Sequence, residues 1–173
     1  MLPTRALWEL NRHQTTNTIK TYIMKLQNTC ALALGIIFLL LGIAGLIPAF
    51  TTIPGETFDS ALPLDVDGIY TKGFGLLFGV FPTNLMHNLF HILVGALGIA
   101  AAKTNKGRTY NQIFGISYIA IAIMGTLPVA KTVFGIMPIF GNNIWWNGLT
   151  AAIATYFGFF GKNPEAPSDR VSA

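Results

Sequence analysis

The sequence predicts an all-α integral membrane protein in which four transmembrane helices form two pseudo-repeated hairpins. Of the 173 residues, 52% are hydrophobic and 10% are charged, and the mean hydropathy of +0.54 exceeds what a soluble surface allows. Four apolar runs each approach the ~20 residues that cross about 30 Å of hydrocarbon. The two halves of the chain also share a sequence pattern. The four runs are Cys30–Phe50, Asn84–Ala102, Tyr110–Ala130 and Asn143–Gly161.

The runs divide the chain into three parts. Residues 1–29 are polar and form a cytoplasmic segment, for which an interfacial helix and a mobile tail are both open alternatives. Residues 30–161 form the transmembrane domain, with a non-cytoplasmic insert at about 51–71. Residues 162–173 carry proline and serine and predict a disordered cytoplasmic tail. The first run is too long for the core of a signal peptide and no cleavage pattern follows it, so we expect it to be retained.

Basic residues orient the helices. They are scattered at the ends of the apolar runs and form no block, which argues against a nucleic-acid surface and for a topological role. Both termini are therefore expected in the cytoplasm, with Lys72 and Lys131 on the opposite side. The residues expected on the cytoplasmic side are Arg5, Arg12, Lys20, Lys25, Lys103, Lys106, Arg108, Lys162 and Arg170.

An internal repeat relates the two hairpins. "GIIFLLLGIAGLIP" from Gly35 and "GISYIAIAIMGTLP" from Gly115 share glycine and proline spacing, and "FGVFP" at 78–82 is echoed by "FGIMP" at 134–138. The repeat predicts two hairpins of the same direction around a pseudo-twofold axis along the membrane normal. The insert and the two transmembrane histidines belong to the first half alone.

A polar face opens the second run. Asn84, His87, Asn88 and His91 follow the i, i+3, i+4, i+7 pattern, so they share one face of a helix. That face should turn away from lipid, because unbonded polar groups in hydrocarbon cost several kcal/mol. In one interpretation the cluster is structural: Asn84 or Thr83 caps the helix. Asn88 and the histidines then bond across the bundle to Asn143, Asn147 and Thr150.

A second interpretation is a cofactor or metal site. His87 and His91 have the i, i+4 spacing at which two imidazoles reach one metal, and Asp65, Asp67 or water would supply a further ligand. A single axial ligand to haem or chlorophyll is also open, although no cofactor is required by the sequence. Proton or ion transport is a third alternative. No nucleophile with an adjacent base, phosphate loop or dinucleotide fingerprint is present, so we expect no enzyme.

Two further patterns have structural explanations. Trp145 and Trp146 start the fourth run, where an interfacial aromatic belt is expected. Small residues spaced by four permit close approach of helices, inside the bundle or to a neighbouring protein. These pairs are Ala31/Gly35, Gly98/Ala102, Gly148/Ala152 and Ala154/Gly158.

The polar face also carries a resemblance. Phe81, Pro82, Asn84, His87, Asn88 and His91, followed by Gly95, form F-P-x-N-x-x-H-N-x-x-H plus glycine. This motif resembles that of a family of uncharacterised bacterial four-helix membrane proteins defined as a domain of unknown function, and the resemblance spans about residues 26–161. The family's second-half motif is N-x-x-D-N-x-L-H, where this chain has Asn143, Trp146, Asn147, Leu149 and Thr150. The resemblance implies a membrane family without an assigned activity and adds no catalytic residue.

Together these patterns predict a non-catalytic accessory or structural subunit of a larger membrane complex. Its expected partners are the lipid bilayer and other membrane protein subunits, in a bacterial inner membrane or in a thylakoid of a photosynthetic host. The alternatives are a haem-, chlorophyll- or metal-binding membrane protein using His87 and His91, and a transporter of small molecules or ions.

Overall fold

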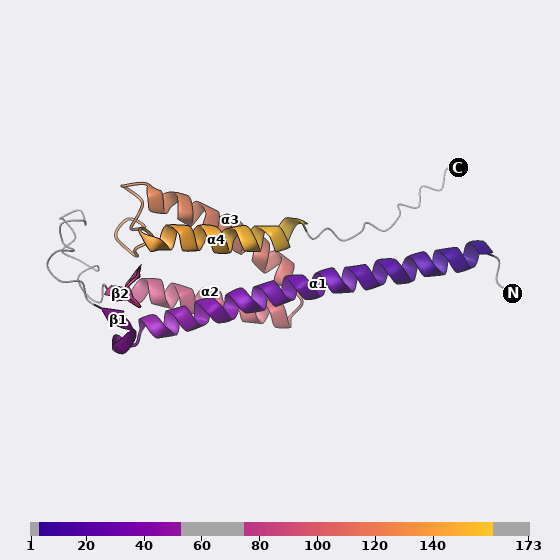
Figure 1. Ribbon diagram of the computed structural model, residues 1–173, viewed down its shortest axis with the longest axis horizontal. Coiled ribbons are helices and arrows are strands. Elements are labelled where there is room, and N and C mark those ends of the chain that lie inside the picture. Colours follow the sequence, from indigo (N-terminus) through magenta and orange to yellow (C-terminus); the bar gives the residue numbers. More distant parts are fainter. Residues whose placement is uncertain (1–3, 53–74, 161–173) are drawn as a thin grey trace.

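The computed structural model describes residues 4–52 and 75–160, and this part of the chain is mostly helical (Figure 1). Its α-helices are α1 (Thr4–Gly45), α2 (Leu85–Lys103), α3 (Gly107–Thr126) and α4 (Asn142–Thr155), which continues as the π-helix Tyr156–Phe160. Two stretches, Asn11–Gly45 of α1 and all of α2, are long and apolar enough to cross a membrane. Most of the predicted insert, with Asp65 and Asp67, lies outside the described residues, as do Lys72 and the tail 162–173.

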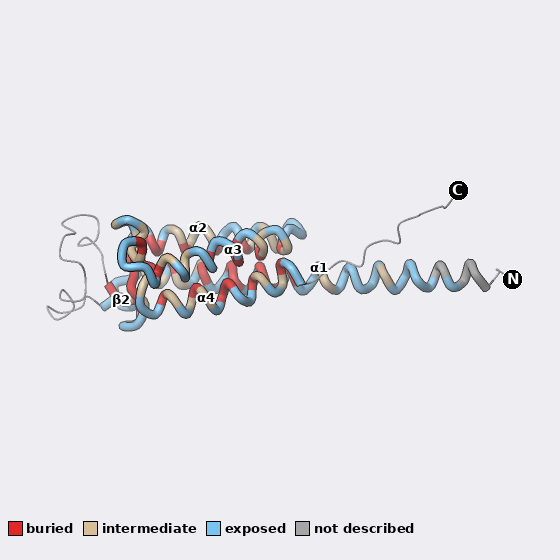
Figure 2. Tube along the Cα trace, turned by 90° about the horizontal axis from the view of Figure 1, so that it is seen from above, coloured by how far each residue is buried: buried red, intermediate tan, exposed pale blue. Residues whose placement is uncertain are grey.

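The first helix is longer than the sequence patterns indicated. α1 runs for 42 residues and passes through position 30 without a break, so its first part projects from the bundle as a straight arm (Figures 1 and 2). No glycine or proline lies between Thr4 and Gly35, so nothing interrupts the helix there. Threonines of the arm bond back to the preceding turn; Thr15 Oγ1 donates to the Asn11 carbonyl at 2.9 Å. The polar segment is thus an extension of α1.

The helices pair as two antiparallel hairpins, α1 with α2 and α3 with α4. Glycines at the same repeat position bring the partners together. A Cβ on Gly35 would lie 2.7 Å from the backbone nitrogen of Ile99, and one on Gly115 would lie 3.0 Å from the backbone nitrogen of Thr155. At Gly115 the hydroxyl oxygen of Thr155 is nearer still, at 2.5 Å. Both glycines therefore let the backbones of paired helices approach closely, as small residues do.

A small antiparallel sheet closes the end of the first hairpin, where the sequence patterns predicted no strand. The 3₁₀ turn η1 (Pro48–Phe50) leads into β1 (Thr51–Thr52), which pairs with β2 (Gly75–Leu77), and β2 pairs with β3 (Phe81–Thr83). These strands of two or three residues are too short for an alternating pattern to be recognised.

The turn between β2 and β3 has a counterpart in the second half. Phe78 and Gly79 have φ of 52° and 70°, and Phe134 and Gly135 have 55° and 95°. In both turns the glycine N–H donates to the carbonyl three residues earlier, at 3.1 Å. The equivalent residues of "FGVFP" and "FGIMP" therefore adopt the same left-handed turn, which supports the internal repeat.

Many of the large apolar side chains of the bundle face outward. Large apolar residues such as Leu93, Ile113 and Ile116 are exposed on the bundle, whereas asparagines and histidines are buried in it (Figure 2). The centre of the bundle is aromatic: Phe38 is fully buried and makes edge-on contacts with Phe114 and Tyr118 at centroid distances of 5.2 and 5.1 Å. Cys30 is a free, buried thiol and belongs to the same core cluster.

Candidate functional site at the head of α2

The polar face of α2 begins with a capping asparagine. Asn84 has extended backbone geometry, and its side-chain oxygen accepts the backbone N–H of His87 at 2.9 Å. This arrangement satisfies one of the free N–H groups at the helix start. The Asn84 amide also donates to the Ile136 carbonyl at 2.8 Å, so the cap is fixed to the second half of the chain. The predicted capping role of Asn84 is confirmed.

Asn88 ties α2 to the end of α1. Its side-chain nitrogen donates to the Gly45 carbonyl at 2.7 Å, and its oxygen accepts the Thr83 hydroxyl at 2.5 Å. Gly45 is the last residue of α1, and carbonyls of the last turn have no partner within the helix. A glycine is needed there, because a Cβ on Gly45 would overlap the Asn88 amide.

The two histidines bond to each other. Their Nε2 atoms are 3.0 Å apart, and the rings meet at 80° with centroids 4.3 Å apart. One Nε2 must carry a proton while the other offers its lone pair, so only one of the two rings is protonated at Nε2. His87 is 5% exposed and His91 is 8% exposed. The Pro138 backbone is close to His87, yet Nδ1 of that ring has no partner within hydrogen-bond geometry among the described residues.

The second half contributes a reciprocal set of bonds. Asn143 donates to the carbonyls of Pro82 and Pro138, at 2.8 and 3.1 Å. Asn142 donates to the Val80 carbonyl at 3.1 Å. Val80 and Ile136 occupy the same place in "FGVFP" and "FGIMP", so each half offers an asparagine to the other half's turn.

The predicted bonds from Asn88 and the histidines across to Asn143, Asn147 and Thr150 are wrong. Thr150 bonds back to the Trp146 carbonyl of its own helix at 2.9 Å, and Asn147 makes no side-chain hydrogen bond within the described part of the chain. The physical reason is the supply of acceptors: the unwound turns expose backbone carbonyls that need donors, and the asparagines provide them.

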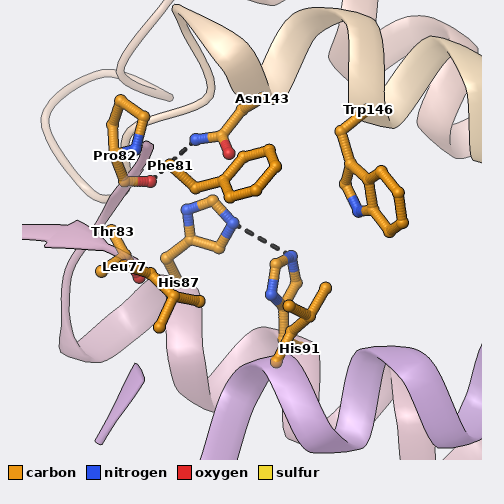
Figure 3. Close-up of a pocket in the computed structure, with 9 residues that line it drawn as sticks. Leu77, Phe81, Pro82, Thr83, His87, His91, Asn143 and Trp146 are labelled. Carbon is orange, nitrogen blue, oxygen red and sulfur yellow. Dashed lines mark hydrogen bonds between the residues drawn. The ribbon is translucent and has the colours of Figure 1, made fainter. Parts of the chain in front are cut away.

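A cavity of about 70 Å³ opens beside the histidines (Figure 3). His87 and His91 approach it from α2, while Asn143 and Trp146 approach it from α4. One water molecule needs about 10–15 Å³, so the volume suffices for a few, but the exposed lining of the cavity is almost entirely apolar. The buried Nε1 of Trp146 has no partner within the described residues, and neither does His87 Nδ1. The remaining lining residues are Leu41, Leu77, Phe81, Pro82 and Thr83.

The site's dimensions limit the cofactors it can hold. Pockets for drug-sized ligands occupy about 300–1,000 Å³, far more than this cavity provides, so a haem or chlorophyll does not fit between the helices. The Nε2 atoms of His87 and His91 converge closely enough to ligate one small ion. No group of three histidine, cysteine, aspartate or glutamate side chains capable of holding a metal occurs within residues 4–52 and 75–160, and Asp65 and Asp67 lie outside these ranges.

Sequence reasoning missed one lining residue that was within its reach. Trp145 is 51% exposed, as expected for an interfacial anchor, but Trp146 turns inward to the cavity. Successive residues of a helix point about 100° apart, so two adjacent tryptophans on a bundle helix can differ in burial. The adjacency of Trp145 and Trp146 in the sequence was therefore the signal that could have predicted an inward-facing tryptophan.

The comparisons with known proteins agree with the boundaries of this fold. No curated protein and no solved structure matches the chain. A family model described as Domain of unknown function (DUF4383) matches residues 28–160. The match contains the four-helix bundle and both left-handed turns with the asparagines that follow them. It leaves out the arm of α1 before residue 28. Because it covers most of the sequence, the chain belongs to the DUF4383 family.

Proposed function

We propose that the protein is an integral membrane protein whose four helices all cross the bilayer, acting as a non-catalytic accessory subunit of a larger membrane complex. The observation that carries the proposal is that apolar side chains lie on the outside and polar side chains on the inside, the reverse of a water-soluble protein. Leu93, Ile113 and Ile116 are 56–62% exposed on the outer faces, while Asn84, Asn111 and Asn143 are 1, 0 and 3% exposed inside. Such a surface is unfavourable in water and favourable in lipid, where polar groups must be satisfied internally.

Helix lengths support four crossings. α2 has 19 residues and α3 has 20, which correspond to about 28 and 30 Å at 1.5 Å per residue. This matches a hydrocarbon core of about 30 Å. The helical segment from Asn142 to Phe160, α4 with its π-helical end, has a comparable length. The expected host is a bacterial inner membrane or a thylakoid.

The basic residues support an orientation. Lys103, Lys106 and Arg108 cluster at the α2–α3 loop, at the same end of the bundle as the arm of α1. The positive-inside rule puts this end in the cytoplasm. The histidine cavity then lies near the opposite face of the membrane.

Topology can be tested with single cysteines in a Cys30→Ala background. Lys106→Cys and Val129→Cys place a thiol in the α2–α3 loop and in the turn after α3, where Val129 is 81% exposed. In intact cells, a membrane-impermeant maleimide should label Val129→Cys only, and labelling of Lys106→Cys should require permeabilised cells. Equal labelling of both positions in intact cells would contradict the proposed crossings.

The accessory role can be tested on the outer face of α4. Gly148 has nothing within 4 Å of a built Cβ, and Ala152, one turn later, is exposed. The Cβ of a Gly148→Leu substitution therefore meets no described atom of this chain, so an effect on assembly would report a neighbouring protein. We expect the wild type to comigrate with a larger complex in native gels and Gly148→Leu to weaken that association. Ala96→Leu, at an exposed position on α2, is the matched control. A wild-type protein that migrates alone from its native membrane contradicts the accessory role.

The convergence of the two Nε2 atoms favours a second candidate function, the binding of a transition-metal ion. Imidazole nitrogens ligate zinc at about 2.0–2.1 Å, so an ion would replace the hydrogen bond between His87 and His91, and water bound to the ion would supply a further ligand. Cobalt(II) is a suitable probe because its bound form absorbs visible light. The purified protein should develop a visible band with cobalt(II), and His87→Gln should abolish it while His13→Gln, on the arm, should not. A band that persists in His87→Gln excludes this site.

A further inference from the structure

A groove lies where the arm of α1 leaves the bundle. It has a volume of about 380 Å³ and is formed by α1, the end of α2 and the following loop. Lys25 and Lys103 are the charged residues of its walls, and both are exposed. The other lining residues are Thr21, Met24, Asn28, Thr29, Leu32, Ala102 and Asn105.

Hydrogen bonds hold the walls of this groove together. The Asn28 side-chain nitrogen donates to the Asn105 side-chain oxygen at 2.8 Å, and the Asn28 oxygen accepts the Gly107 backbone N–H at 3.0 Å. One asparagine of α1 therefore fixes both the α2–α3 loop and the start of α3. Because these contacts are made within the chain, the groove is preformed and a ligand need not order it.

The groove carries positive charge without a counter-ion in the described residues. No ion pair engages Lys25 or Lys103 there. Glu9 is the single acidic residue of residues 4–52 and 75–160, and it lies about 24 Å from Lys25 along the helix axis at 1.5 Å per residue. The hydroxyls of Thr21 and Thr29 already donate to carbonyls of their own helix. The two ammonium groups carry the positive charge of the groove, and an anion complements them.

The α1 wall of the groove carries its charge at the arm end and an apolar residue at the bundle end. Thr21, Met24 and Lys25 lie toward the arm, while Leu32 lies about 10 Å beyond Lys25 along α1 into the bundle. Ala102 of α2 lines the same groove, one residue before Lys103. A ligand that fits this arrangement has an anionic group followed by a hydrocarbon chain.

We propose that this groove binds an anionic phospholipid of the cytoplasmic leaflet, with its phosphate at Lys25 and Lys103 and the start of an acyl chain along Leu32 and Ala102. The inference rests on the proposed membrane crossing, which puts this end of the bundle at the cytoplasmic headgroup layer. Basic grooves between helices at that layer bind acidic headgroups, and each lysine near an anionic surface contributes about 1 kcal/mol.

Native mass spectrometry of the full chain in detergent tests the site. Phosphatidylglycerol and phosphatidylcholine with identical acyl chains are the probes. The wild type should bind phosphatidylglycerol more tightly, by up to about 25-fold, if each lysine contributes about five-fold. The preference should disappear in Lys25→Gln/Lys103→Gln. It should remain in Lys20→Gln/Lys106→Gln, which removes the same charge from the same end of the bundle without touching the groove. Equal loss in both double variants, or no preference in the wild type, overturns the proposal.

Two further measurements are needed. The first distinguishes a lipid phosphate from a soluble phosphate, and the second distinguishes failure of the lipid site from failure of the proposed membrane crossing. Glycerol phosphate at millimolar concentration should not displace the lipid; if it binds as tightly as phosphatidylglycerol, the site recognises a soluble phosphate and the lipid assignment is overturned. Alkaline carbonate washing of membranes should leave the protein in the pellet. Release by carbonate would contradict both the proposed function and the lipid site, whereas retention without a lipid preference would overturn the lipid site alone.

Discussion

The side-chain amide of Asn88 bonds through both its nitrogen and its oxygen, to two separate segments of the first half of the chain. Its nitrogen bonds to a carbonyl at the end of α1, and its oxygen accepts the hydroxyl of Thr83 in β3. The residue is 3% exposed, so water cannot replace either bond. A single amide therefore holds the end of α1, the last strand and the start of α2 in register.

Asn88→Leu should destabilise the protein more than a comparable change at an exposed asparagine. The substitution leaves the Gly45 carbonyl and the Thr83 hydroxyl without partners, and we expect a loss of about 2 kcal/mol. Reversible unfolding in mixed micelles measures it. Asn142→Leu is the control, because Asn142 is exposed although it also bonds a carbonyl. Equal effects at the two positions would show that burial of the amide is not what matters.

The sequence pattern identified the face of this site but not its partners. The i, i+3, i+4, i+7 spacing correctly predicted that Asn84, His87, Asn88 and His91 share one face and that this face is buried. The partners follow from the left-handed turns at Phe78–Gly79 and Phe134–Gly135, which set the backbone carbonyls that the asparagines meet. Periodicity carries no information on those dihedral angles. The bond between His87 and His91 likewise depends on side-chain torsions.

At the scale of elements, apolar runs located the helices well and their ends less well. The second run was expected at Asn84–Ala102 and α2 is Leu85–Lys103. The first run was expected from Cys30, but α1 begins at Thr4 because polar residues without glycine or proline also sustain a helix. The short strands were not predicted, because pairing between Thr51 and Leu77 joins the start of the insert to a segment that follows it.

Two glycine substitutions should separate the inner and outer faces of the helices. A Cβ on Gly35 would lie 2.7 Å from the Ile99 nitrogen, so Gly35→Ala should force α1 and α2 apart and cost about 1–3 kcal/mol. Gly148→Ala has open space and should be neutral or stabilising by up to about 1 kcal/mol through helix propensity. Thermal unfolding of both variants in the same detergent measures the difference. A neutral Gly35→Ala would contradict the close contact of α1 and α2.

At the scale of the whole molecule, the bundle and the arm of α1 are distinct parts. The family match begins at residue 28, beside the groove of Lys25 and Lys103. The described side chains of residues 11–26 are exposed or half-buried, and none is buried. Arg12 lies over the Trp8 ring at 3.5 Å, a contact within the arm itself. The arm thus adds little to the bundle's packing.

A variant lacking residues 2–20 should keep the bundle folded. These residues bury no described side chain, so the midpoint of thermal unfolding in detergent should change by no more than about 2 °C, which corresponds to less than 1 kcal/mol for a protein of this size. Circular dichroism of the variant should show the loss of helical signal from the removed residues alone. A large fall in the midpoint would show that the arm contacts the bundle.

The aromatic layer around Phe38 has a consequence for permeability. The polar cluster at the head of α2 ends at this ring, which contacts the edge of His91 at a centroid distance of 4.9 Å and is itself fully buried among Phe114 and Tyr118. Water and ions do not wet an apolar constriction of this kind. If the four helices cross the bilayer as proposed, we therefore expect the axis of the bundle to be an electrical insulator, and a membrane holding many copies of the protein to keep its ion gradient.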